Sequence, residues 1–190
     1  MTARSRELCL VAALVAVGSV LRVGLGELAL TAPIPLYGVL IKVGLTETFA
    51  FVSGFVFGAA PGFLTGALII VTSDLLMIPG PWTPFIAVII GIIGIGGGAI
   101  RRLVGNPSVL VLGVSAAGLT LMSEFLQNAW FALFFNIPIA AALAMAIPSM
   151  LTAVANNVVL LTTVGVKTIW LIQKLTVSSS DCRDERAGRI

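Results

Sequence analysis

The chain has 190 residues, of which 58% are hydrophobic and 10% are charged, and its formal net charge is +3. Its mean hydropathy is +1.12, whereas soluble domains carry about 25% charged residues, so the composition indicates an integral membrane protein and excludes a soluble domain. The chain contains no His, and its two Cys lie near opposite ends. We therefore expect no metal site, no disulfide framework and no cofactor.

Six membrane-spanning helices are predicted, and the expected fold is an all-α bundle. A helix rises about 1.5 Å per residue, so each apolar stretch can cross most of a hydrocarbon core about 30 Å thick. Residues 1–175 form the predicted membrane domain, and residues 176–190 form a polar tail. The predicted spans are 7–24, 36–57, 63–77, 85–100, 109–134 and 149–172.

Segments rich in Pro and Gly separate the predicted spans. In chain order they read GELALTAPIP, GAAPG, IPGPWTP, RRLVGNPS and NIPIAAALAMAIP. Because Pro and Gly interrupt helices, each segment is expected to be a loop or a turn. The last segment is long enough to hold a short interfacial helix.

The distribution of basic residues predicts the orientation, because cytoplasmic loops of membrane proteins are enriched in Lys and Arg. With six spans and the N-terminus inside, both termini are cytoplasmic, and the expected location is the plasma membrane. Arg22 and Lys42 then lie near outer helix ends, where they can extend toward the interface. The basic residues on the cytoplasmic side would be Arg4, Arg6, Arg101, Arg102, Lys174, Arg183, Arg186 and Arg189.

Small residues recur at helical spacing in two places. Glycines recur every four residues over 54–66, and again at Gly94 and Gly98. Such spacing lets helix backbones approach closely, and internal packing is the favoured interpretation. Ala12 and Ala16 form an A-x-x-x-A stripe in the first span, which would either pack internally or dock a partner helix.

Polar side chains recur inside the apolar spans. Glu124, Gln127 and Asn128 share one face of the fifth predicted span, and Asn156 lies at a similar depth on the sixth. A charge at the bilayer centre costs about 2.5–3.5 kcal/mol, so such residues face the bundle interior and have partners. The remaining polar or aromatic candidates in the outer half are Glu47, Asp74 and Trp82.

Three interpretations of these residues stay open: a ligand pocket, a structural hydrogen-bond network and an ion path. A single polar pair would suit a network, because interhelical hydrogen bonds contribute only about 0.6–2 kcal/mol each. Polar groups on four spans in one half of the bundle favour a water-accessible pocket. The predicted ligand-binding residues are Glu124, Gln127, Asn128, Asn156, Trp82, Glu47 and Asp74.

The chain resembles the S component, the substrate-binding membrane subunit, of energy-coupling factor (ECF) vitamin transporters. Three stretches carry the resemblance, which covers nearly the whole chain: LVAALVAVGSVLRV, FVSGFVFGAAPGFLTGALIIVTSDLLMIPGPWTPF, and SEFLQNAWFAL together with AIPSMLTAVANNVVL. The resemblance implies capture of a vitamin or related metabolite from outside and ATP-driven uptake. It also implies docking through Ala12 and Ala16 to a transmembrane coupling subunit driven by two ATPase subunits, with Trp82 and segment 24–35 covering the ligand.

Two other classes of protein remain open. A structural or electron-transfer-complex subunit would use the polar residues only to hold helices together. A small membrane enzyme would use Glu47, Asp74 or Glu124, but no P-loop, H-E-x-x-H or G-x-S-x-G motif occurs, so we expect no enzyme activity. The small net charge does not point to nucleic acid. The excess of acidic groups in the predicted outer half favours a neutral or cationic ligand rich in hydrogen-bond donors.

Overall fold

The computed structural model describes residues 3–31, 44–105 and 108–172, and every regular element within them is helical. The predicted all-α class is therefore confirmed. The elements are α1 (Ala3–Thr31), α2 (Leu45–Phe57), α3 (Ala59–Leu76), α4 (Thr83–Val104), α5 (Val109–Phe134), α6 (Ile139–Leu160) and the π-helical turn η1 (Leu161–Gly165), after which the helix continues to residue 172.

Five helical stretches of the described chain are long and apolar enough to cross a membrane, which makes this a multi-pass membrane protein by length and composition. The apolar helix α2 has 13 residues and is shorter than a full span. The first part of its predicted span, residues 36–43, lies outside the described residues, as does the predicted tail at 176–190. The five long stretches are Glu7–Gly24, Ala59–Leu76, Thr83–Val104, Val109–Phe134 and Ile139–Ile172.

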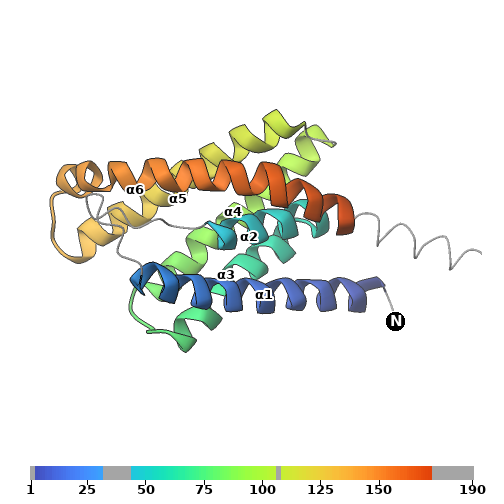
Figure 1. Cartoon of the computed structure of the whole chain (residues 1–190), viewed down its shortest axis with the longest axis horizontal. Coiled ribbons are helices and arrows are strands. Elements are labelled where there is room, and N and C mark those ends of the chain that lie inside the picture. Colours follow the sequence, from blue (N-terminus) through green and yellow to red (C-terminus); the bar gives the residue numbers. More distant parts are fainter. Residues whose placement is uncertain (1–2, 32–43, 106–107, 173–190) are drawn as a thin grey trace, which may run out of the picture.

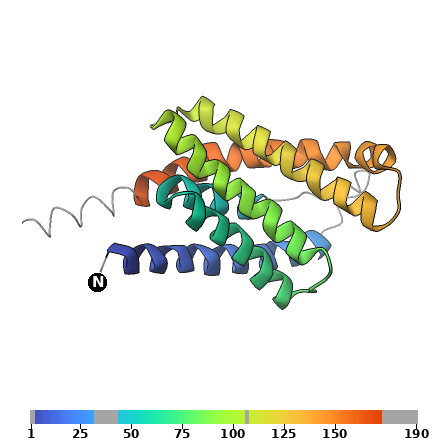
Figure 2. The same cartoon turned by 180° about the vertical axis from the view of Figure 1, so that it is seen from behind.

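The helices form three layers (Figures 1 and 2). Helix α1 lies along one side and contacts α2 and α3, while the α5–α6 pair lies along the opposite side and contacts α4 and α2. Helices α2, α3 and α4 fill the middle layer. The N-terminal end of α1 and the end of the helix at residue 172 lie at the same end of the bundle (Figure 1). The described chain therefore crosses the bundle an even number of times.

The middle layer is held together by direct contact between helix backbones. A Cβ on Gly54 or Gly62 would overlap the backbone of Gly94, and a Cβ on Gly98 would overlap Ala59. The predicted internal packing of the glycines is thus confirmed, because only residues without a side chain allow this approach. Gly58 joins α2 to α3 with φ of 109°, a conformation that favours glycine.

Helices α5 and α6 form a tight hairpin, and this corrects the predicted loop over 135–148. The backbone N–H of Ile137 donates to the carbonyl of Ala132 at 2.9 Å, and Asn136 has φ of 53°. This is a Schellman motif with Asn in the left-handed position, and Pro138 follows it. Helix α6 begins at Ile139 rather than at the predicted residue 149, because the Ala-rich segment favours helix and Pro148 is accommodated inside it.

Helices α1 and α4 extend beyond their predicted C-terminal ends by amounts that local signals do not specify. Helix α1 continues to Thr31, so most of the predicted 24–35 loop is helical and residues 32–35 lie outside the described part. Helix α4 gains one turn at its C-terminal end. The π-turn η1 interrupts the last span: the N–H of Val166 donates to the carbonyl of Leu161, five residues back. Such a turn inserts one extra residue into an α-helix.

Candidate functional site

A small, partly open cavity lies between α2, α4, α5 and the α6–η1 helix. Its volume is about 10 Å³, roughly the room that one water molecule needs. Its polar lining comes from Glu47 and Thr48 on α2, Thr120 on α5 and Asn157 on α6, while apolar side chains complete the wall. The polar groups come from three helices that are distant in sequence. This is the pattern of a small-molecule site, in which a few polar groups converge in a mostly apolar cavity.

Asn157 is the central polar residue of this cavity. Its side chain is 3% exposed, and its Nδ2 donates a hydrogen bond of 2.8 Å to Thr120 Oγ1. Its Oδ1 is buried and has no hydrogen-bond partner. The one other described side-chain atom in this state is Ser19 Oγ on α1, which lies outside the cavity lining. An unpaired buried acceptor costs about 1–3 kcal/mol, so Asn157 is held in a state that a donor would relieve.

The N-terminus of α2 faces the same place. Gly44 caps this helix and lies so close to Asn157 that a Cβ on Gly44 would overlap the amide group. Thr48 Oγ1 donates to the Gly44 carbonyl at 3.1 Å, and Glu47 lies in the first turn. A carboxylate in the first turn is stabilised by the positive end of the helix dipole. Helix α2 therefore positions an acidic group at the wall of the cavity.

The three predicted residues on α5, Glu124, Gln127 and Asn128, do not belong to the lining of this cavity. Glu124 is 2% exposed and lies one turn beyond Thr120. Gln127 Nε2 donates to Ser123 Oγ at 2.9 Å, and Asn128 Nδ2 donates to the Glu124 carbonyl at 2.8 Å. Both amides therefore form hydrogen bonds within their own helix, as expected of residues with a purely structural role.

On α6 the structure places Asn157, rather than the predicted Asn156, in the cavity lining. Asn156 is half-buried on a neighbouring face of the helix. The sequence pattern puts both amides at nearly the same depth, so depth alone does not choose between them. Thr48 and Thr120 were also missed as lining residues. The spacing of Thr120 and Glu124, one helical turn apart, was the available signal for Thr120.

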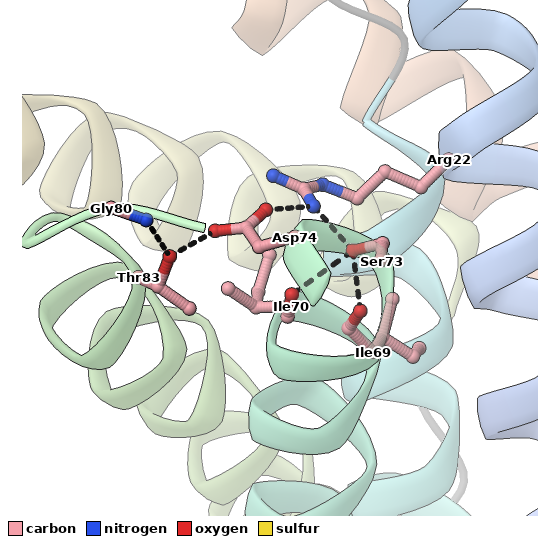
Figure 3. Close-up of polar contacts among 7 residues, drawn as sticks. All are labelled: Arg22, Ile69, Ile70, Ser73, Asp74, Gly80 and Thr83. Atoms are coloured by element: carbon pink, nitrogen blue, oxygen red, sulfur yellow. Dashed lines mark hydrogen bonds and ion pairs between the residues drawn. The ribbon is translucent and has the colours of Figure 1, made fainter. Parts of the chain in front are cut away.

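Asp74 belongs to a second polar cluster, at the other end of α3 from Gly58 (Figure 3). Its Oδ1 accepts from Arg22 Nη1 at 2.5 Å in an ion pair, and its Oδ2 accepts from Thr83 Oγ1 at 2.7 Å. Arg22 also donates to Ser73 Oγ, whose hydroxyl donates to the Ile69 carbonyl at 2.5 Å. We call Arg22, Ser73, Asp74 and Thr83 the Arg22–Asp74 cluster; it joins α1, α3 and the start of α4.

Trp82 lies beside the Arg22–Asp74 cluster rather than at the cavity. It is the N-cap residue of α4, it is half-buried, and its ring packs over Gly80. The backbone N–H of Gly80 donates to Thr83 Oγ1 at 3.2 Å. Of the seven predicted ligand residues, all within the described part of the chain, Glu47 alone lines the cavity, whereas Asp74 and Trp82 lie at the Arg22–Asp74 cluster.

Ala12 and Ala16 are exposed on α1. The buried residues Val11 and Ser19 lie beside the stripe: around the helix axis, Val11 is about 100° and Ser19 about 20° from Ala12. Of the two interpretations of the A-x-x-x-A stripe, internal packing within the described chain therefore does not apply. The stripe presents a small-residue surface outside the bundle.

Within the described residues, no group of three or more His, Cys, Asp or Glu side chains is arranged to hold a metal ion. No protein-family model, no curated protein and no solved structure matches the chain. The function is therefore argued from the cavity and the surface of α1.

Proposed function

We propose that the chain is the substrate-binding membrane subunit of an ECF-type uptake system, which captures a vitamin or a related small metabolite from outside. The observation that carries this proposal is the cavity between α2, α5 and α6, where a buried amide oxygen on Asn157 has no partner. A protein that needed only to hold its helices together would gain stability from pairing or removing that acceptor.

The exposed stripe at Ala12 and Ala16 supports the second half of the proposal, namely a partner. Small side chains on a membrane helix let another helix approach closely. In this proposal the stripe docks a transmembrane coupling subunit, and two ATPase subunits supply the energy. Both termini lie in the cytoplasm of a cell whose plasma membrane holds the complex, as the Lys and Arg distribution favours.

A structural or electron-transfer-complex subunit is the second candidate. The bonds that Gln127 and Asn128 make within their own helix favour it, because those amides need no ligand. The two candidates differ in the cavity: only substrate binding gives Asn157 Oδ1 a function.

Uptake measurements test the proposal directly. Cells that express the chain with a coupling subunit and two ATPases should accumulate one labelled compound from a panel of water-soluble vitamins. Ala12→Trp or Ala16→Trp should abolish uptake while the purified chain still binds that compound. Leu110→Trp is the matched control, because Leu110 is exposed on α5, away from α1. Failure to accumulate any compound, or loss of binding in Ala12→Trp, would count against the proposal.

Cysteine labelling tests the orientation. In a chain with Cys9 and Cys182 replaced by Ser, a cysteine at position 105 should react only after the membrane is permeabilised. A cysteine at position 137, in the α5–α6 turn, should react from outside. The reverse pattern would place the cavity on the other half of the membrane.

A further inference from the structure

The guanidinium group of Arg22 uses only one of its three nitrogens inside the bundle. Its Nη1 donates to Ser73 Oγ and to Asp74 Oδ1, which occupies both hydrogens of that nitrogen. Within the described residues, the structure gives Nε and Nη2 no hydrogen bond, and the side chain is 28% exposed. Figure 3 shows one guanidinium nitrogen turned toward Ser73 and Asp74 and another turned away from both. Arg22 therefore has a free edge with hydrogen-bond donors.

The free edge has the geometry that an oxyanion needs. The N–H groups of Nε and Nη2 lie in one plane and point in parallel directions, so that two oxygens of a phosphate or carboxylate can accept from them at once. A pair of this kind is stronger and more specific than a single hydrogen bond. The chemistry of the free edge of Arg22 is thus that of a phosphate site.

The position of Arg22 along the helices brings this edge to the boundary of the membrane. Arg22 lies two residues before the end of the apolar stretch Glu7–Gly24, and Asp74 lies two residues before the end of Ala59–Leu76. Helix α4 begins at Thr83, which bonds to the same carboxylate. Three apolar helical stretches therefore end or begin at one depth, where the hydrocarbon core gives way to lipid headgroups.

The surface around the ion pair is apolar and exposed. Val20 on α1 is 68% exposed, and Leu75, Leu76 and Ile78 at the end of α3 are 66–73% exposed. In a membrane protein such side chains contact lipid. An Arg side chain with this surrounding extends its charged group toward the interface, where phosphate groups are the main acceptors.

Asp74 opposes the binding of a second anion, because like charges repel. It lies on the Nη1 side of Arg22, however, and both of its oxygens already accept hydrogen bonds, from Arg22 and from Thr83. The ion pair as a whole is neutral, so its attraction for an anion at long range is weak. Binding therefore depends on the hydrogen bonds of the free edge, which favours an anion that the membrane already holds at this depth.

We infer that the free edge of Arg22 binds the phosphate of a phospholipid headgroup between the ends of α1 and α3. The ion pair with Asp74 holds the guanidinium group in place from one side, and the lipid phosphate accepts from the other. This lipid site does not depend on the cavity or on the proposed transport function.

Native mass spectrometry of the full-length chain in detergent tests the site with three lipids that have the same acyl chains. Phosphatidylglycerol and phosphatidylcholine contain a phosphate, and diacylglycerol contains none. Both phospholipids should bind about tenfold more tightly than diacylglycerol, the effect of about one hydrogen bond to a charged group. Equal binding of the three lipids would overturn the inference.

Arg22→Lys is the decisive variant, because the single nitrogen of Lys can pair with Asp74 but provides no second edge. It should lose the preference for phospholipids and keep a melting temperature close to that of the wild-type chain. Arg102→Lys makes the same substitution on an exposed residue at the other end of α4 and should keep the preference. An equal loss in both variants would show a general attraction of phospholipids to basic residues and would contradict the assigned site.

Asp74→Asn provides a second test if Arg22→Lys does not fold. This change removes the repelling charge and retains an acceptor for Nη1, so phospholipid binding should become severalfold tighter. Unchanged or weaker binding would count against the site. An excess of inorganic phosphate distinguishes the two sources of the anion: retention of the bound phospholipid supports the headgroup, whereas its displacement would overturn the assignment to lipid.

Discussion

The two polar clusters of this bundle differ in whether their hydrogen bonds are complete. In the Arg22–Asp74 cluster, both carboxylate oxygens have donors, from Arg22 and from Thr83. In the cavity, the Asn157 amide has a partner on its nitrogen but none on its oxygen. Both clusters consist of polar residues in apolar helices, and sequence alone treats them alike. The first cluster joins three helices with the hydrogen bonds of its carboxylate complete, whereas the second leaves one acceptor without a partner, as the proposed binding site requires.

The completed cluster should carry the larger share of stability. Asp74 has a side-chain exposure of 5% and Arg22 of 28%, so removing one partner leaves the other charge poorly solvated. Breaking a buried ion pair in this way costs about 3–5 kcal/mol, whereas replacing both partners by apolar residues can be neutral. A single substitution at Asp74 and a double substitution at Arg22 and Asp74 therefore form a matched pair of variants.

The largest expected effect follows from Asp74→Ala. This change should lower the free energy of unfolding by about 3–5 kcal/mol, because it strands the Arg22 guanidinium. The double variant Arg22→Met with Asp74→Leu should recover most of that loss. Unfolding of the detergent-purified chain in a denaturing-detergent titration measures both. Equal stability of Asp74→Ala and the wild-type chain would show that the cluster does not fasten α1 to α3.

The cavity should respond in the opposite way. Replacing both members of its polar pair, in Thr120→Val with Asn157→Leu, should leave the melting temperature unchanged or raise it. The reason is that the change removes an unpaired buried acceptor together with its partner. The free energy of binding of the transported compound should weaken by about 1–3 kcal/mol. A large drop in melting temperature with normal binding of the remaining folded protein would make this pair structural as well.

Gly44→Ala tests how closely α2 approaches Asn157. The new methyl group would overlap the Asn157 amide, and overpacking of this kind costs about 1–3 kcal/mol. Ligand binding should be lost together with that stability. Gly24→Ala on α1 is the control, because a Cβ there meets nothing within 4 Å. An unchanged melting curve and normal binding in Gly44→Ala would contradict the described position of the α2 N-terminus.

The smallest effect is expected for Asn128→Ala. Its amide donates to the Glu124 carbonyl of its own helix, so its removal should cost no more than about 0.6 kcal/mol of stability. Ligand affinity, measured by calorimetry, should stay within twofold of the wild-type value. A tenfold loss of affinity would instead indicate that Asn128 contacts the ligand, as its spacing in the sequence predicts.

The helices could be predicted from the sequence because their signals are local. The span 109–134 matches α5, which begins after the Ser108 cap and ends at the Asn136 turn. The start of α6 was missed because Pro148 reads as a helix breaker, although an Ala-rich helix accommodates it.

The candidate site was less predictable, because its pairs are distant in sequence. Thr120 and Asn157 are 37 residues apart, and Arg22 and Asp74 are 52 apart. Helical spacing cannot show which of two adjacent amides faces a neighbour, since consecutive residues differ by about 100° around the helix axis. The choice of Asn157 over Asn156 depends on how α6 packs against α2 and α5.

The π-turn at Leu161–Gly165 determines which residues of the last helix face the bundle after Asn157. Because η1 holds one residue more than an α-helical turn, a regular α-helix with the same number of residues would advance every later residue by one position. The segment from Val166 to residue 172 would then rotate by about 100° relative to Asn157. Ile169 and Ile172, which are buried, would turn toward lipid. The π-turn therefore lets Asn157, before it, and Ile169 and Ile172, after it, all face the bundle.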